Sequence, residues 1–176
     1  MGLIKRGIEP VDGMHRAGDA VMPLLARLVF AGVLLIYFWN SAGTKLDGLF
    51  TIDFGAYAQI FPKKFEAAGF DTSMMSTLDA LIVYAAACGE YILPALIILG
   101  LFTRLASLGM IVFVIVQSLT DIYGHGIDAA TIGAWFDRAS NSLIADQRAF
   151  WMFLFIYLVF YGGGALSVDR LIAVKR

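Results

Sequence analysis

Four long runs of apolar residues divide the chain, and each is long enough to cross a bilayer as a helix. The runs cover residues 20–43, 77–100, 104–123 and 148–165. A helix needs about 17 to 25 predominantly apolar residues to cross the hydrocarbon core. The pattern therefore predicts an all-α fold, a polytopic membrane four-helix bundle, in which residues 1–176 form a single integral membrane domain.

The connections between these runs predict different local structures. Only a few residues separate the second and third runs, so these two must form an antiparallel hairpin. Between the first and second runs, the stretch FGAYAQIFPKKFEAAGF is interrupted by proline and has apolar residues at helical intervals, at Phe54, Tyr57, Ala58, Phe61 and Phe65. This spacing predicts one or two interfacial helices, although rings packed over the mouth of the bundle would give the same pattern. The pattern assigns no role to the loop 124–147.

Composition places the chain among integral membrane proteins. Its residues are 60% hydrophobic and only 15% charged, and the mean hydropathy is +0.78. The net charge of -1 provides no basic face for nucleic acid, so we expect no nucleic-acid partner. The single cysteine, Cys88, lies inside an apolar run, so neither an intrachain disulfide nor a cysteine-based metal cage is expected.

The distribution of basic residues predicts the orientation of the chain. Seven basic residues lie at the termini or in the short second connection: Lys5, Arg6, Arg16, Arg104, Arg170, Lys175 and Arg176. Five lie in or beside the two long connections: Lys45, Lys63, Lys64, Arg138 and Arg148. Because cytoplasmic loops carry the excess of Lys and Arg, both termini are expected in the cytoplasm.

One acidic residue inside an apolar run is the main candidate for chemistry. Glu90 lies about 15 Å from the cytoplasmic end of its run, near the middle of the membrane. A carboxyl group at that depth costs several kcal/mol unless it is neutral, paired or facing water. Pro94 also removes the backbone N–H that would bond the Glu90 carbonyl. We expect Glu90 to relay a proton or donate a hydrogen bond when neutral, and to pair with Arg27 or Arg104 when ionised.

Arg27 lies about two turns inside the first run. Its side chain either extends to the lipid headgroups or points into the bundle, and the first arrangement is the expected one. Lys45 follows about five helical turns later. On a straight helix the two bases therefore share one stripe with Ala31, Leu34, Phe38 and Ser41.

Several side chains are candidates for contact with a cofactor ring, namely Tyr91, Gln117, Tyr157 and Tyr161. Tyrosine rings stack on and hydrogen-bond to aromatic ligands, but in a membrane bundle they also serve as plain packing. Gln117 shares a helix face with Asp121 and His125. Gln117 is the deepest of the three and is expected to face protein, whereas Asp121 and His125 are expected at the interface.

Motifs for other cofactors are missing from the chain. The carboxylates near His125 have no second histidine beside them, and the sequence contains neither a heme attachment motif nor a nucleotide-binding loop. We therefore expect no metal, heme or nucleotide. Any oxidoreduction would use the redox centre of a partner or a bound quinone.

Four stretches of the sequence resemble the DoxX family. They are ARLVFAGVLLIYFWNSAGTKL, FPKKFEAAGF, GEYILPALIILGLFTRLASLGM and GGGALSVDRLI, in this order between Arg27 and Ile172. The most specific are the membrane glutamate followed by a Gly-Leu-x-Thr-Arg-Leu turn and the closing Ser-x-Asp-Arg-Leu. The resemblance implies a four-helix protein of the bacterial inner membrane. Members of the family have been linked to quinone-dependent sulfur oxidation and to membrane oxidoreductase complexes that handle thiol or oxidative stress.

Three functions are compatible with these observations. The first is a quinone-interacting membrane subunit of an oxidoreductase, with Glu90 as proton carrier or hydrogen-bond donor. The second is a non-catalytic membrane anchor or assembly subunit. A small-molecule or proton-coupled transporter is less favoured, because four spans without inverted repeats make a small transport unit. The expected partners are the lipid bilayer and either other membrane or redox subunits or further copies of the chain.

Overall fold

The computed structural model describes residues 17–48 and 51–174. Within these residues, four helices are long and apolar enough to cross a membrane: Ala17–Gly43, Thr77–Leu99, Thr103–His125 and Leu143–Tyr161. The predicted all-α, polytopic bundle is therefore confirmed. Most of the N-terminal segment, together with Lys175 and Arg176, lies outside the described residues.

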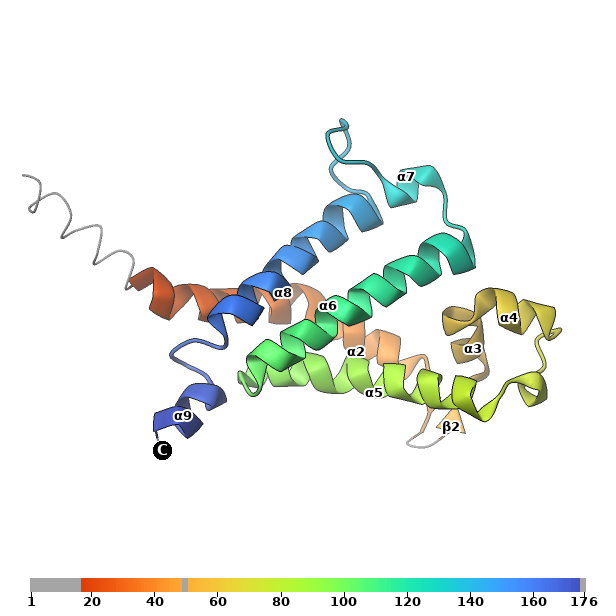
Figure 1. Cartoon of the computed structure of the whole chain (residues 1–176), viewed down its shortest axis with the longest axis horizontal. Coiled ribbons are helices and arrows are strands. Elements are labelled where there is room, and N and C mark those ends of the chain that lie inside the picture. The colour runs from red at the N-terminus through yellow and green to blue at the C-terminus, as the bar shows by residue number, and fades with distance from the viewer. Residues whose placement is uncertain (1–16, 49–50, 175–176) are drawn as a thin grey trace, which may run out of the picture.

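The elements follow one another as an antiparallel bundle with a helical insertion after the first span (Figure 1). The first helix passes through a π-helical segment, and the insertion follows it: η1 (Ala31–Leu35), α2 (Ile36–Gly43), the antiparallel strands β1 (Leu46–Asp47) and β2 (Thr51–Ile52), α3 (Phe54–Ile60), α4 (Pro62–Ala67) and the 3-10 turn η2 (Thr72–Met74). The remaining elements are α5 (Thr77–Leu99), α6 (Thr103–Leu119), the π-helical η3 (Thr120–His125), α7 (Ala129–Ile132), the π-helical η4 (Leu143–Arg148), α8 (Ala149–Tyr161) and α9 (Val168–Val174).

Local signals fix both ends of α5. Ser76 and Asp79 form a capping box at its start, and Gly100 ends it in the left-handed conformation with φ +67°. A left-handed glycine at this position is a common helix stop. The helix continues unbroken through Pro94 and turns directly into α6, as the short connection predicted. The fourth helix begins earlier than predicted, at Leu143. It ends at Tyr161, because Gly162 leaves the helical conformation.

The insertion consists of two short helices that cover one end of the bundle. Asp53 caps α3 by accepting a hydrogen bond from the Gly55 N–H, and Pro62 begins α4. The buried rings of Tyr57 and Phe65 form a cluster with Val83 of α5. Both sequence interpretations of this stretch therefore describe part of the arrangement: the helices form, and their rings pack over the mouth of the bundle.

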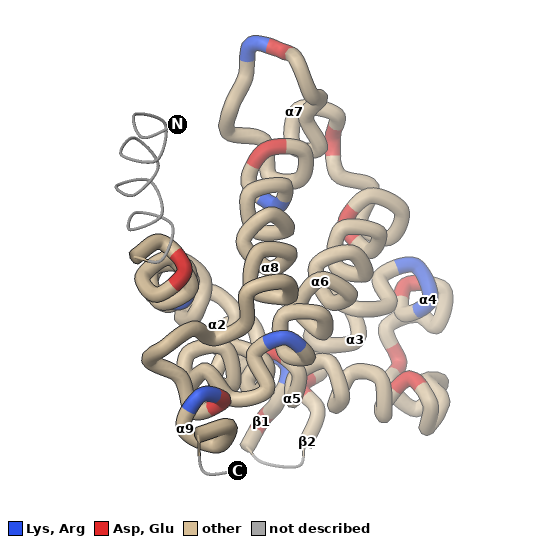
Figure 2. The backbone as a smooth tube through the Cα atoms, turned by 60° about the vertical axis from the view of Figure 1, so that its left-hand side comes forward, with Lys and Arg blue, Asp and Glu red and all other residues tan. Residues whose placement is uncertain are grey.

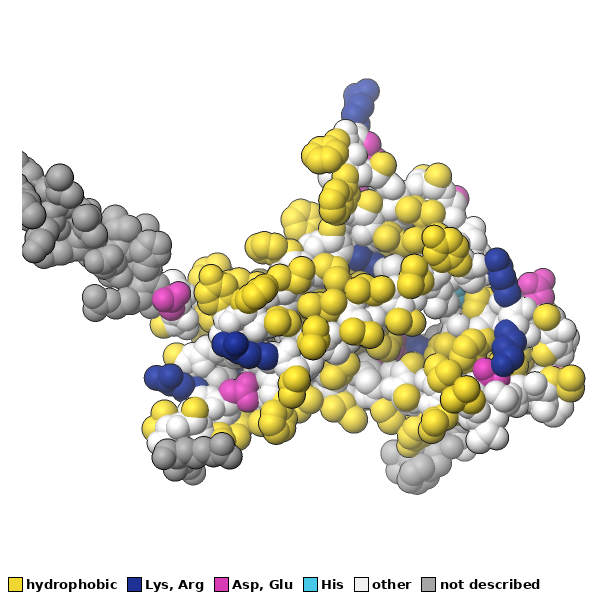
Figure 3. All heavy atoms as spheres, in the orientation of Figure 1, with side chains coloured by type: hydrophobic (Ala, Val, Ile, Leu, Met, Phe, Trp, Pro, Cys, Tyr) yellow, Lys and Arg dark blue, Asp and Glu magenta, His cyan; other side chains and the backbone are white. Residues whose placement is uncertain are grey.

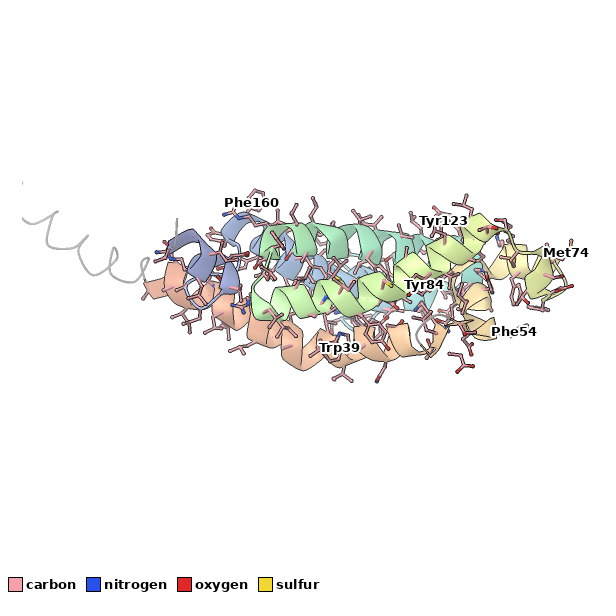
Figure 4. All side chains as sticks on the ribbon, turned by 90° about the horizontal axis from the view of Figure 1, so that it is seen from below. Trp39, Phe54, Met74, Tyr84, Tyr123 and Phe160 are labelled. Carbon is pink, nitrogen blue, oxygen red and sulfur yellow. The ribbon has the colours of Figure 1, made fainter. Side chains whose placement is uncertain are left out.

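The core lies along the axis of the four long helices. Its buried residues recur every four positions on the first helix and continue on the other three: Phe30, Leu34, Phe38, Ile97, Ala106, Met110, Val114, Phe155 and Leu158. The outer faces are also apolar, as the space-filling view shows over α6 and α8 (Figure 3). Tyr123 and Phe160, for example, lie on the outside of the bundle (Figure 4). Charged positions gather mainly at the ends of the long helices and in the connections, as expected for a membrane protein (Figure 2).

A polar cluster ties the first helix, the α5–α6 turn and the C-terminal segment together. Arg27 is buried and donates hydrogen bonds to the carbonyl oxygens of Ile97 and Ile98, and to those of Gly163 and Leu166. These carbonyls belong to the end of α5 and to the segment after α8. The expected extension of Arg27 to the lipid headgroups is therefore wrong, because the guanidinium satisfies carbonyls that a helix end leaves without partners.

Asp169 completes this cluster from the other side. Its carboxylate accepts hydrogen bonds from the N–H groups of Phe102 and Thr103 and from the Thr103 hydroxyl, at 2.7, 2.9 and 2.8 Å. These groups form the first turn of α6, where a negative charge is favoured by the helix dipole. The start of α6 is thus capped by a residue from the far end of the chain.

Candidate functional site

Glu90 is buried in the middle of α5, where only 2% of its surface is exposed. Both carboxylate oxygens have partners on the end of the first helix. Oε1 accepts a hydrogen bond from the Ser41 hydroxyl at 2.8 Å, and Oε2 lies 2.8 Å from the Lys45 ammonium. Glu90 is therefore held inside the bundle by a hydroxyl and a positive charge.

Lys45 completes a closed polar cluster with Glu90 and Ser41. Its side chain is almost fully buried, and besides Glu90 its Nζ donates to the Ser41 hydroxyl and carbonyl oxygens at 2.9 and 3.1 Å. The three protons of the ammonium group thus each have an acceptor. Lys45 directly follows the C-terminal cap of α2, so the partial negative charge of that helix end also favours the ammonium.

The predicted pairing of Glu90 with Arg27 or Arg104 is wrong. The Arg27 guanidinium bonds to backbone carbonyls at the C-terminal end of α5, about two turns beyond Glu90, and Arg104 lies exposed at the start of α6 beside Gly162. The stripe that joins Arg27, Ser41 and Lys45 on the first helix was visible in the sequence. That stripe includes Lys45, the partner that the structure shows, but the sequence pattern places Lys45 in the connection after the helix.

The cluster lies on the wall of a cavity of about 230 Å³ between α2, α3, α5 and α6. The polar lining residues are Ser41, Lys45, Gln59, Glu90, Gln117, Thr120, Asp121 and His125. The apolar ones are Ile60, Ile82, Ala86, Phe113 and Val116. The cavity therefore combines a charged, hydrogen-bonding wall with an aromatic and aliphatic one, as small-molecule sites do.

The other polar groups of the cavity connect it to neighbouring elements. Gln117 donates from Nε2 to the Tyr37 hydroxyl at 2.8 Å, and its buried Oε1 has no hydrogen-bond partner among the described residues. Asp121 lies 2.6 Å from the buried Arg148 of η4, and His125 Nε2 lies 3.0 Å from the carbonyl oxygen of Gln59. Gln117 faces protein as expected, whereas Asp121 and His125 line the same cavity instead of lying only at the interface.

The sequence model of the DoxX family matches residues 22–121. This is more than half of the chain. The chain belongs to the DoxX family. The matched stretch covers the first three membrane helices and every cavity residue except His125. No curated protein and no solved structure matches the chain.

The tyrosines proposed from the sequence lie elsewhere in this DoxX protein. Tyr91 is adjacent to Glu90 in sequence but is 40% exposed, and its backbone carbonyl accepts a hydrogen bond from Trp39. Tyr157 and Tyr161 stack on each other at 4.5 Å on α8. None of the three lines the cavity, so of the predicted ring contacts only Gln117 is placed there.

The arrangement gives this DoxX protein a defined chemical capacity. A carboxylate and an ammonium group in contact can exchange a proton over the length of one hydrogen bond, and both line a cavity inside the apolar bundle. Hydrogen bonds are stronger in such a low-dielectric environment than in water. The cluster can therefore donate to, or accept from, a polar atom of a ligand while apolar side chains hold the rest of it.

Proposed function

We propose that this DoxX protein is a quinone-interacting membrane subunit of an oxidoreductase system in the bacterial inner membrane, with both termini in the cytoplasm. The observation that carries the proposal is the buried cluster of Glu90, Lys45 and Ser41 at membrane depth, on the wall of a cavity that also has aromatic and aliphatic lining residues. Intramembrane ionisable residues that face a cavity commonly mark substrate or proton pathways.

The size and lining of the cavity are suited to one substituted ring. An apolar cavity of about 150 Å³ accommodates benzene, so a cavity of about 230 Å³ accommodates a ring with small substituents. Lys45 would donate a hydrogen bond to a ring carbonyl oxygen in place of one of its two bonds to Ser41, and Phe113 provides an aromatic side chain on the same cavity.

Each residue of the cluster has a separate role in the proposal. A bound quinone would supply redox chemistry that consumes protons on reduction. Glu90 relays the exchangeable proton, Lys45 orients the ring oxygen, and Ser41 fixes the positions of both side chains through its two hydrogen bonds. Gln59 and His125, at the ends of α3 and η3, line the same cavity and would pass protons to the cluster. Electrons would come from a partner subunit or a soluble donor.

The test measures binding of a short-chain benzoquinone to the full-length protein in lipid nanodiscs by equilibrium dialysis. Replacing both charges with Glu90→Gln and Lys45→Met in one chain keeps the cavity neutral and should weaken binding by about tenfold or more, the loss expected for one strong polar contact. Tyr157→Phe, which removes a hydroxyl outside the cavity, serves as the control and should bind like the wild type. Absence of binding to the wild type would contradict the proposal.

A non-catalytic anchor or assembly subunit is the second candidate. The observation that favours it is the complete internal satisfaction of the cluster, because such an ion pair also serves to join α2 to α5 without any ligand. In that case the doubly substituted protein would insert, fold and retain its partner subunits like the wild type, and the quinone would bind neither form. Co-purification from membranes together with the dialysis measurement separates the two candidates.

A further inference from the structure

The contact between α5 and α6 changes along their length. From the turn to the middle of α5 the helices are close, since a Cβ atom on Gly109 would lie 3.1 Å from Leu93 and one on Gly89 would lie 3.9 Å from Phe113. Toward the start of α5 the two helices separate, and the cavity lies between them (Figure 1). Gln59 and Ile60 at the end of α3 also line the cavity there.

Two residues of the cavity wall also belong to the lipid-facing surface. Ile82 of α5 is 41% exposed and Val116 of α6 is 56% exposed, and both line the cavity. Ile82 lies about 8 Å along the axis from the start of α5, and Val116 about 14 Å from the end of η3, at 1.5 Å per residue. Both are therefore at the depth of the hydrocarbon core. The space-filling view shows a recess beside α3 and α4, with charged atoms visible at its floor (Figure 3).

The charged cluster and the apolar residues at this opening lie on different sides of the cavity. Its charged cluster of Glu90 and Lys45 lies on the inner wall, and its apolar residues Ile82, Ala86 and Val116 lie on the side that reaches the surface. The volume of about 230 Å³ is below the roughly 300 to 1,000 Å³ of pockets that enclose a whole drug-sized ligand. A ligand that fills the cavity with its ring must leave any larger apolar part outside.

We propose that the cavity opens laterally into the lipid between Ile82 and Val116, and that its ligand is a membrane-dissolved molecule whose apolar chain lies in this opening. The inference rests on the proposed ring site and adds to it a subsite for the chain. The ring reaches the charged cluster from the bilayer, and the chain contacts the exposed faces of α5 and α6. The subsite selects for chain-bearing lipids over compact soluble molecules with the same ring.

The test compares two probes in nanodiscs. A methyl-substituted benzoquinone reports the ring site by equilibrium dialysis. The same ring with an isoprenoid chain is incorporated into the nanodisc lipid, and the mole fraction that displaces half of the methyl probe reports the chain subsite. The variants are Ile82→Trp and Val116→Trp. Their controls are Leu81→Trp and Val112→Trp, since these residues are 63% and 55% exposed on the same helices and do not line the cavity.

In the two opening variants, the required mole fraction of the chain-bearing probe should rise by about tenfold, the loss expected when roughly two methylene groups give up their contacts. Because Ile82 and Val116 also line the cavity, any loss of affinity for the methyl probe should be clearly smaller than that for the chain-bearing probe, and the controls should change neither value. Unchanged displacement in the opening variants would refute the lateral opening while leaving the ring site intact. An equal loss of both probes would refute it as well, because the two residues would then affect the ring site alone. A wild type that binds neither probe overturns the proposed function and this inference together.

Discussion

Glu90→Gln is the most informative single substitution for the polar cluster. Glutamine retains the shape of the side chain but removes its charge, so the Lys45 ammonium, which is 5% exposed, loses its counter-ion. Breaking a buried ion pair by removing one partner costs about 3 to 5 kcal/mol. Because Lys45 keeps its two hydrogen bonds to Ser41, we expect the lower end, about 3 kcal/mol of the free energy of unfolding.

The double variant, Glu90→Gln with Lys45→Met, provides the decisive comparison. It leaves no uncompensated charge, so it should be more stable than Glu90→Gln alone by about 2 kcal/mol, an interaction energy typical of contacting residues. Unfolding by SDS in mixed micelles, followed by tryptophan fluorescence, measures both values. Trp39 is a suitable reporter because its indole N–H donates to the Tyr91 carbonyl oxygen across the α2–α5 contact.

Two results would refute this reasoning. A cost for Glu90→Gln below about 1 kcal/mol, the value of an exposed pair, would mean that water in the cavity screens the charges. Additive costs in the double variant would mean that the two side chains do not interact energetically despite their separation of 2.8 Å.

Four further substitutions test the ends of the bundle by the same unfolding assay. Asp169→Ala removes the cap of α6 and should cost about 2 kcal/mol, and a cost near zero would show that water replaces the carboxylate. Gly100→Ala should cost at least about 2 kcal/mol, because alanine is disfavoured at φ +67° and its Cβ would lie 2.6 Å from the Cβ of Ser167. A neutral effect would contradict this close contact. Asp121→Asn should cost more than Arg148→Met, since it leaves the deeper of the two charges without its partner, and the reverse order would contradict this assignment.

The spans and their order could be predicted because they depend on local information. Length and hydropathy identify helices that cross a membrane, and a short connection leaves an antiparallel hairpin as the available geometry for α5 and α6. The spacing of rings around Pro62 likewise predicted one or two short helices, and α3 and α4 form there. In each case the property that decides the structure lies within about twenty neighbouring residues.

The partners of the buried charges could not be predicted in the same way. The burial of Glu90 followed from its position, but its partner depends on how the first helix packs against α5. That helix carries a π-helical segment, η1, which alters the register of a straight helix. The partners of Arg27 could not be predicted either, since its acceptors are backbone carbonyls, which no side-chain pattern reveals. Helix-end carbonyls at this depth lack water, so a nearby arginine is attracted to them even without an acidic partner.

The attachment of Arg27 to two distant segments has a consequence for biosynthesis. As the chain leaves the ribosome, the first helix enters the bilayer with a guanidinium whose acceptors do not yet exist. The hairpin supplies the carbonyls of Ile97 and Ile98, but those of Gly163 and Leu166 become available only after the last helix has inserted. Until its final span is in place, a nascent protein therefore has only part of the hydrogen bonds that hold this guanidinium inside the finished bundle.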